Sequence, residues 1–249
     1  AVFTPPKGVA VLVVMAPHDT QDVPDSGPTV ASRTTMVVGK VVQDATRALV
    51  ARVREVAGDK PFSEAARSLR DHPEWPFRIR QTYETKEGIE WDPKAYVGDA
   101  YPCYGWAADV AFVEVDLDTY ETKILDFHTA EDVGKAIHPR MVEGQIEGGT
   151  LQGIGYAYME EVKTEGGAVL NHRMTNCIIP TSLDAPEIKT YIVEAPYSFG
   201  PHGAKGVGEL PLDGAAPAVA AAIEHATGVH VDSAPFTPEM LAERLGANA

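Results

Sequence analysis

The stretch from Gly200 to Leu212 is the part of the sequence that most limits what the chain can form. Its four glycines are Gly200, Gly203, Gly206 and Gly208. Each loses extra backbone entropy on ordering, which disfavours a helix or strand interior, but glycines also let a main chain turn tightly or approach a ligand closely. The run ends at a single carboxylate, Glu209. We therefore expect one of two structures, an ordinary surface turn or a loop that holds Glu209 beside a ligand.

A long helix is predicted over Thr35–Ala57. Valine, alanine and leucine recur there at three- and four-residue spacing, and Gly58 follows as a helix end. Hydroxyl side chains gather at its start and come from Ser32, Thr34 and Thr35. Such hydroxyls most often cap a helix, but unpaired amides, the positive end of the helix dipole and the Arg33 guanidinium also suit a phosphate or diphosphate. The sequence leaves both interpretations open.

A second long helix is predicted over Ile137–Glu161, and it is unusually rich in glycine. Each interior glycine costs roughly 1 kcal/mol against alanine, so several kcal/mol of helix propensity are given up. Two pairs of small residues lie four positions apart, Gly144 with Gly148 and Gly149 with Gly153. This spacing lets another backbone or a flat ligand lie against the helix. Gln145 and Gln152 offer amides that suit the edge of a heterocycle, although glutamines more often face solvent.

Shorter elements are predicted elsewhere. Val9–Ala16 is a continuous apolar run with β-branched residues, which favours a buried strand. Alternation over Val110–Leu117 and Lys123–His128, with turn residues between them, predicts an antiparallel hairpin. The other predictions are a helix over Pro61–Asp71 capped by Ser63, a strand over Pro76–Thr85, strands or extended segments over Ile178–Leu183 and Ile188–Glu194, a helix over Ala215–Thr227 that ends at Gly228, and a last helix that starts at Thr237.

Composition indicates a folded, acidic protein. With 249 residues, 44% hydrophobic and 23% charged, we expect a mixed α+β fold with short, mostly antiparallel sheets, as one domain over residues 1–249 or with two lobes. The net charge of -15 argues against nucleic acid or an anionic membrane as a partner. No apolar run approaches the roughly 18 residues of a membrane span, and no export signal is evident, so we expect a cytoplasmic protein. The aromatic residues of Tyr101–Trp106 are expected in the core or at an interface.

Three segments together resemble one protein family. They are Gly27–Thr35, Gly144–Gly155 and Gly203–Glu209, the last reading Gly-Ala-Lys-Gly-Val-Gly-Glu. In this order they are similar to segments of the C-terminal part of the molybdenum-binding subunit of the xanthine dehydrogenase and aldehyde oxidoreductase family. The similarity extends from about Val9 to Ala226. Each segment alone is a weak signal, whereas three in the same order are specific. The implied fold is the second half of a molybdopterin-binding domain.

The resemblance implies roles for individual residues. Glu209 falls on the catalytic base beside the molybdenum, and Gln145 falls on a glutamine that hydrogen-bonds the pterin. The other residues expected to contact the cofactor are Ala31, Ser32, Arg33, Thr34 and Thr35 at the pterin and its phosphate end, and Gly206, Val207 and Gly208 beside the base. The pterin dithiolene holds the molybdenum, so no side chain here need ligate the metal. The cofactor is expected as its cytosine dinucleotide form.

The implied activity is hydroxylation of an electron-poor carbon in a heteroaromatic or aldehyde substrate with oxygen from water. Glu209 would accept a proton, and partial burial would raise the pKa of its carboxyl toward a useful value. Two other chemistries fit poorly. A nucleotide-binding phosphate loop needs Ser or Thr directly after its lysine, whereas Gly206 follows Lys205. The eight histidines also lack paired zinc-ligand spacing.

The chain departs from the family in two ways. It lacks the earlier Gly-Gly-Phe-Gly type of segment that closes over the active site, and Cys103 and Cys177 cannot hold a four-thiolate cluster. We therefore expect the missing parts to come from other chains or from a further part of the polypeptide. The expected partners are a complementary molybdenum-binding chain, an Fe–S subunit and, as a further candidate, a flavin subunit with FAD. Purines, nicotinate-like heterocycles and aldehydes are all family substrates. The alternative is a non-catalytic assembly subunit that keeps the fold and uses Tyr101–Trp106 for contact with partner chains.

Overall fold

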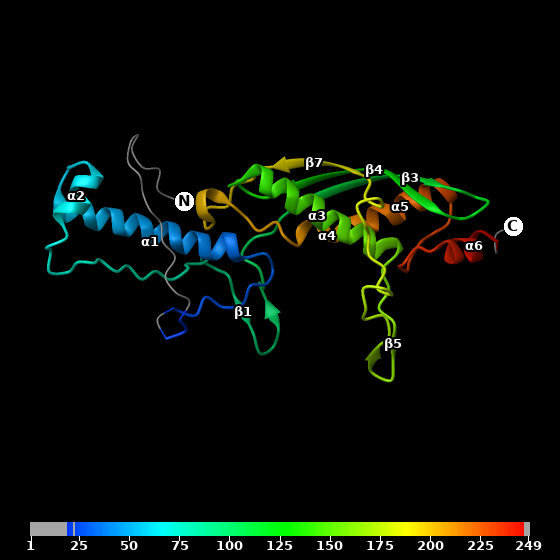
Figure 1. Cartoon of the computed structure of the whole chain (residues 1–249), viewed down its shortest axis with the longest axis horizontal. Coiled ribbons are helices and arrows are strands. Elements are labelled where there is room, and N and C mark those ends of the chain that lie inside the picture. The colour runs from blue at the N-terminus through cyan, green and yellow to red at the C-terminus, as the bar shows by residue number, and fades with distance from the viewer. Residues whose placement is uncertain (1–18, 22, 247–249) are drawn as a thin grey trace. The chain divides into compact units, whose positions relative to one another are not determined.

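The computed structural model describes residues 19–21 and 23–246, and the chain divides into two compact units (Figure 1). Unit 1 contains the chain up to Pro102 together with Ser198–Gly203, and unit 2 contains Cys103–Tyr197 and the chain from Ala204 onward. Helices and short sheets are both present, which confirms the α+β class. The strand predicted over Val9–Ala16 lies outside the described residues.

Unit 1 is built on the long helix α1 (Thr34–Ala57), which confirms the prediction from apolar spacing. Gly58 ends it with a φ of 70°, and its amide donates to the Arg54 carbonyl at 2.8 Å. A left-handed φ of this kind favours glycine, which explains why the helix stops there.

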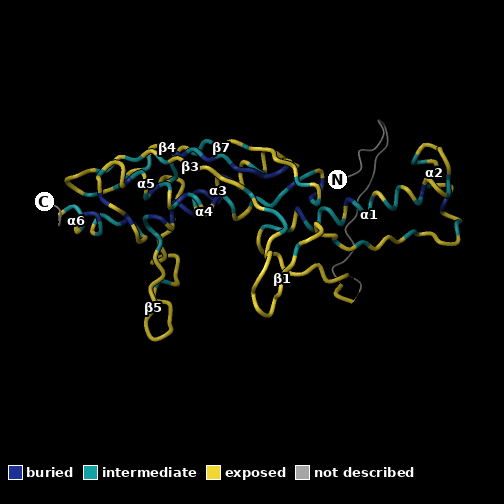
Figure 2. The backbone as a smooth tube through the Cα atoms, turned by 180° about the vertical axis from the view of Figure 1, so that it is seen from behind, coloured by how far each residue is buried: buried dark blue, intermediate teal, exposed yellow. Residues whose placement is uncertain are grey.

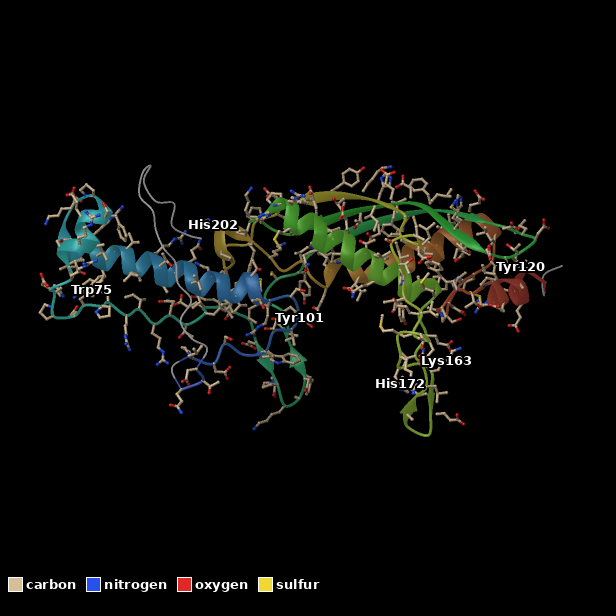
Figure 3. All side chains as sticks on the ribbon, viewed as in Figure 1. Trp75, Tyr101, Tyr120, Lys163, His172 and His202 are labelled. Carbon is tan, nitrogen blue, oxygen red and sulfur yellow. The ribbon has the colours of Figure 1, made fainter. Side chains whose placement is uncertain are left out.

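The short helix α2 (Phe62–Ser68) contacts α1. Its buried contact is formed by Val53, Ala65 and Leu69. α2 ends before Asp71, the predicted last residue. After Ser68 the chain forms tight turns, in one of which the His72 amide donates to the Leu69 carbonyl. The N-cap residue of α2 is Pro61, and no side chain caps the helix. The predicted Ser63 cap is therefore wrong, since Ser63 lies inside the helix. Beyond these turns Trp75, labelled in Figure 3, packs edge-on against Phe77 at 5.9 Å between ring centroids.

The strand predicted over Pro76–Thr85 is wrong. Alternation suggests a strand, but a strand also needs a neighbour to hydrogen-bond, and no ladder among the described residues includes this segment. The sheet of unit 1 is instead a small antiparallel hairpin of β1 (Trp91–Asp92) and β2 (Val97–Gly98). Its turn is stabilised by the Asp92 carboxylate, which accepts hydrogen bonds from the Lys94 and Ala95 amides at 2.8 and 3.1 Å.

Unit 2 contains a three-stranded sheet of order β3-β4-β7. β3 (Ala107–Val115) and β4 (Thr122–Asp132) form the predicted antiparallel hairpin. Its turn uses the Asp116 carboxylate as an acceptor for two backbone amides and ends at Tyr120 (Figure 3). β7 (Glu187–Val193) confirms the second of the two extended segments, and it pairs with β4 in parallel, which the sequence did not indicate.

Helices cover one face of this sheet (Figure 1). They are α3 (Pro139–Tyr158), α4 (Leu210–Asp213), α5 (Ala215–Thr227) and α6 (Pro238–Gly246). α3 begins where predicted, with the His138 ring accepting from the Met141 amide, but ends three residues before Glu161. α5 and the start of α6 match the predictions. The buried core between sheet and helices includes Phe127, Ile154, Val219, Ile223 and Leu241 (Figure 2).

A short hairpin of β5 (Thr164–Glu165) and β6 (Ala168–Val169) projects from unit 2, with Lys163 and His172 at its base (Figures 1 and 3). Of the strand or extended segment predicted over Ile178–Leu183, no strand forms. The end of that segment forms a turn instead, in which the amide and hydroxyl of Thr181 both donate to Asp184. Among the described residues, no helix has both the length and the apolar character needed to cross a membrane.

Candidate functional site

The glycine-rich stretch is divided between the two units. Gly200–Gly203 belongs to unit 1 and contains the 3₁₀ turn η1 (Pro201–Gly203), with His202 at a φ of 54° (Figure 3). The part that leads to Glu209 belongs to unit 2. It begins with a bridge between Ala204 and Gly134, just beyond the end of β4. The unit 2 part of the stretch is thus a loop that is anchored at the end of β4.

A nearly buried ion pair fixes the base of this loop. The Lys205 ammonium donates to Asp132 Oδ2 at 2.6 Å and to the Tyr104 carbonyl at 3.0 Å. The two paired side chains are 11% and 6% exposed. The other Asp132 oxygen accepts from the Gly134 amide at 3.0 Å, and the Lys205 amide donates to the Val133 carbonyl. Apart from the bond to Tyr104, these contacts join the loop or its support to the end of β4.

Glu209 lies where the loop enters α4. Its backbone is the cap of that helix, and its carbonyl accepts from the Leu212 amide at 3.0 Å. The side chain is exposed, as is Gly208, while Gly206 and Val207 are half-buried. The next residue, Leu210, packs closely on Gly105. A Cβ added to Gly105 would lie 2.8 Å from the Leu210 Cδ2. The loop is therefore held on both sides of an outward-facing carboxylate, and the partial burial expected for Glu209 is not seen in this chain.

The glycines of α3 divide it into a packed face and an open face. A Cβ at Gly149 would lie 3.0 Å from Pro211, and one at Gly153 would lie 2.6 Å from both the Leu212 carbonyl oxygen and the Ala215 Cβ. These two glycines therefore let α4 and α5 approach α3 closely. By contrast, a Cβ at Gly144 or Gly148 would meet no atom within 4 Å. This open face is bordered by the exposed Gln145.

A cavity of about 710 Å³ continues this side of unit 2. Its apolar wall comes from α3, the Ile179–Pro180 segment and the start of α5, and its polar groups are those of Gln152, Tyr156, Glu160 and Asp213. Gly148 and Leu212 also line it. Since Leu212 is three residues beyond Glu209, and Gly148 is nearly one helical turn from Gln145, the cavity adjoins the segments that carry both predicted site residues.

The other predicted site residues lie in unit 1, at the start of α1. Ala31 and Ser32 have left-handed φ values of 51° and 53°, which are uncommon for residues with a Cβ. The cap position is Arg33 and has no capping side chain, so the hydroxyl cap is not formed there; Thr34 and Thr35 are already inside the helix. The Arg33 guanidinium donates to the Ser26 carbonyl at 2.6 Å, which points it back along the preceding loop.

The described residues offer no group of three or more His, Cys, Asp or Glu side chains that could hold a metal ion. Cys103 is half-buried, which raises the pKa of its thiol, and Cys177 is exposed. Asp132 and Lys205 were not predicted as site residues. The only signal for them in the sequence is a charged residue at a strand end and another beside the glycines.

Comparison with known proteins identifies the family. Residues 10–186 match the model of the molybdopterin cofactor-binding domain. The chain is 29% identical over 242 residues to a probable xanthine dehydrogenase subunit of Bacillus subtilis, which covers 91% of this chain and 32% of that protein. It is 30% identical to the 6-hydroxypseudooxynicotine dehydrogenase complex subunit gamma of Paenarthrobacter nicotinovorans, over 91% of this chain and 31% of that one.

A solved structure agrees with these relatives. The aldehyde oxidoreductase from Desulfovibrio gigas matches with a TM-score of 0.76 and 29% identity, over 91% of this chain and 24% of that one. The chain thus spans about a third or less of the length of these proteins. It belongs to the molybdopterin cofactor-binding domain family, in the molybdenum-binding subunits of the xanthine dehydrogenase and aldehyde oxidoreductase type.

Proposed function

We propose that this chain forms one wall of a molybdenum-pterin site in a molybdenum hydroxylase, with Glu209 as the catalytic base. The observation that carries the proposal is the placement of Glu209, an exposed carboxylate on a loop whose base is fixed by the buried pair of Lys205 and Asp132. An ordinary surface turn gains nothing from such an anchor, whereas a base must be held at a fixed place relative to its substrate.

The open face of α3 fits a flat heterocyclic group. Gly144 and Gly148 leave the helix backbone uncovered, and the Gln145 amide beside them can donate to and accept from a ring edge. We assign this face to the pterin, with Gly206, Val207 and Gly208 lining the same group. The start of α1, from Ala31 to Thr35, is assigned to the phosphate end, because the first amides of a helix have no intrahelical partner and favour anions.

When bound, the cofactor supplies a two-electron oxidation of a carbon–hydrogen bond. Overall, a hydroxyl group from water replaces a hydrogen on an electron-poor carbon of a heteroaromatic or aldehyde substrate, and two protons and two electrons are released. Glu209 accepts one of those protons at its carboxylate. General base catalysis of this kind requires hydrogen-bond reach more than strong basicity, which suits an exposed, well-anchored carboxylate.

We assign the remaining parts of the enzyme to polypeptide outside this sequence. They are a complementary molybdenum-binding chain, an Fe–S subunit that receives the electrons and a flavin subunit with FAD. One relative is named as a subunit of a dehydrogenase complex, which supports a multi-chain arrangement. We further propose the cytosine dinucleotide form of the cofactor and a cytoplasmic location.

Replacing Glu209 with glutamine tests the function. In the purified complex, Glu209→Gln should lower turnover by a factor of about 10² to 10⁴, the usual contribution of a general base, while molybdenum and pterin content stay at the wild-type level. Glu114→Gln is the matched control, since Glu114 is an exposed glutamate on β3. Wild-type turnover by the Glu209 variant would rule out the catalytic role.

A non-catalytic assembly role is the second candidate, and one observation favours it. Tyr104 and Trp106 are 61% and 75% exposed, so large aromatic surfaces are open to a partner. In that case the complex would contain partner chains but neither molybdenum nor pterin, and Trp106→Ala would reduce co-purification of those chains. Stoichiometric molybdenum in the complex excludes this role.

A further inference from the structure

The sheet face that the helices cover is apolar along most of its length but polar at one end. Ala111, Val113 and Val115 of β3 and Phe127 of β4 pack in the core. Asp109, Thr129 and Glu131 continue these two rows, because residues two apart on a strand point to the same face. Thr129 and Glu131 are both 0% exposed, and Asp109 is half-buried. Two carboxyl groups and one hydroxyl thus share the buried end of the sheet.

The Thr129 hydroxyl lies between the two carboxyl groups. It donates to Glu131 Oε1 at 2.8 Å, and it lies opposite Asp109, its register partner on β3, where a hydrogen bond from Thr129 also acts on the aspartate and lowers its pKa against the effect of burial. A hydroxyl has only one proton to donate. If that proton goes to Glu131, the bond to Asp109 requires a proton on the aspartic acid. If Glu131 is the protonated acid, the hydroxyl turns and donates to Asp109. Both arrangements require a proton on at least one of the two acids, so the hydroxyl cannot bridge two carboxylates.

Other groups nearby do not neutralise the pair. Asp109 Oδ1 and Glu131 Oε2 are buried and have no hydrogen-bond partner among the described residues. The charged groups that act on Glu131 come from β3 and α4 and are Asp109 and Asp213, both acidic. Burial, with smaller contributions from these two acids, raises the pKa of Glu131 to about 7 despite the Thr129 hydrogen bond, and burial also raises the pKa of Asp109. Two full charges at this place would be strongly unfavourable.

The pair also supports the helix that follows Glu209. The Asp109 carboxylate occupies the position that a Cβ at residue 214 would take, so only glycine fits there. Gly214 ends α4 and caps α5, and Glu209 caps the other end of α4. Since α4 has only four residues, a shift of Asp109 against Gly214 would be transmitted directly to the carboxylate loop.

We propose that Asp109, Thr129 and Glu131 form a hydroxyl-bridged acid pair that holds one proton and thereby positions α4 and the Glu209 loop. Asp109 and Glu131 are positioning residues, since they act on Glu209 through Gly214 and α4. The effect on turnover rests on the proposed function, but the shared proton does not.

The first test measures stability in the purified complex. A carboxyl with a raised pKa must lose its proton at higher pH in the folded state than in the unfolded state, so its contribution is complete below the ordinary value of 4.5 and is lost as pH rises through about 7. Glutamine imitates the protonated acid. Relative to Glu131→Gln, the wild-type folding equilibrium should therefore weaken up to about tenfold per pH unit within that window, as one linked proton requires.

Asp109→Asn should weaken the pH dependence of the folding equilibrium. Thr129→Val should alter this pH dependence by removing the bridging hydroxyl, and Glu114→Gln should leave it unchanged. If Glu131→Gln and Asp109→Asn both keep the wild-type dependence, no proton is shared and the proposal fails.

The second test measures the pH profile of kcat/KM. If the pair positions Glu209, wild-type kcat/KM should fall as pH rises through about 7, and Glu131→Gln should remove that decline while KM stays unchanged. An unchanged profile, together with an altered stability dependence, would overturn the positioning role. A wild-type complex that contains the cofactor but has no hydroxylase activity would contradict the proposed function, while the stability test would still decide whether the proton is shared.

Discussion

The Lys205 ammonium and the Asp132 carboxylate, 73 positions apart in the sequence, lie 2.6 Å apart and are almost fully buried in unit 2. Asp132 is the last residue of β4, and Lys205 is four residues before Glu209. The same ammonium donates to the Tyr104 carbonyl, so one side chain connects three separate segments. The geometry of the carboxylate loop thus depends on a charge that contributes nothing directly to chemistry.

Lys205→Met should strongly destabilise unit 2. The change leaves the Asp132 carboxylate buried without its counter-charge, which typically costs about 3–5 kcal/mol. Lys135→Met is the matched control, since Lys135 pairs with Glu194 at 2.7 Å but both side chains are well exposed, at 49% and 36%. That change should cost about 0–1 kcal/mol. Denaturant titration of the complex measures both, and equal losses would contradict the structural role given to Lys205.

The two faces of α3 should respond differently to alanine. Gly153→Ala brings a Cβ within 2.6 Å of the Leu212 carbonyl, a backbone atom that cannot move alone, so it should destabilise by about 1–3 kcal/mol. Gly144→Ala meets no atom and should stabilise the helix by up to about 1 kcal/mol.

If the pterin lies on the open face, however, Gly144→Ala should also lower the molybdenum content of the complex. Thermal unfolding and metal analysis of the two variants separate these effects. Full molybdenum content in a stabilised Gly144→Ala complex would remove this face from the cofactor site.

The start of α1 should govern cofactor retention. Ser32→Ala combined with Thr34→Ala removes two hydroxyls that we assign to the phosphate end, so less molybdenum should remain after gel filtration. Thr46→Ala is the control, because the Thr46 hydroxyl lies further along the same helix and donates to the Val42 carbonyl. Molybdenum content equal to that of the control would argue against an anion site at this helix start.

Elements with strong local patterns were predictable from the sequence. α1 and α5 follow from apolar spacing and from glycines that end them, and the β3–β4 hairpin follows from alternation around Asp116. The failures have a physical cause in pairing. Pro76–Thr85 alternates, but no strand in the described part of the chain pairs with it, and the two-residue strands β1 and β5 are too short to leave a periodic signal.

The candidate site was predictable only where one segment carries the information. Glu209 at the end of its glycines and Gln145 on its helix could be named from the sequence. The anchor of Lys205 on Asp132 could not, because it joins segments 73 positions apart, next to an antiparallel bridge between Gly134 and Ala204 that no local pattern encodes. Glu131 was missed for the same reason, since a glutamate beside an aspartate in sequence suggests a surface position, yet it is 0% exposed.

Because β4 and β7 run in the same direction, both strands end at one edge of the sheet. There the Val133 amide donates to the Val193 carbonyl, and the Ala195 amide reaches Asp132. Parallel neighbours need a long crossover between them, and α3 is part of that crossover. The helix that carries Gln145 therefore also determines where β7 begins, and β7 leads to the segment that carries Glu209. An insertion within α3 would therefore displace both residues at once, whereas an insertion in the β5–β6 hairpin, which projects from the same connection, would displace neither.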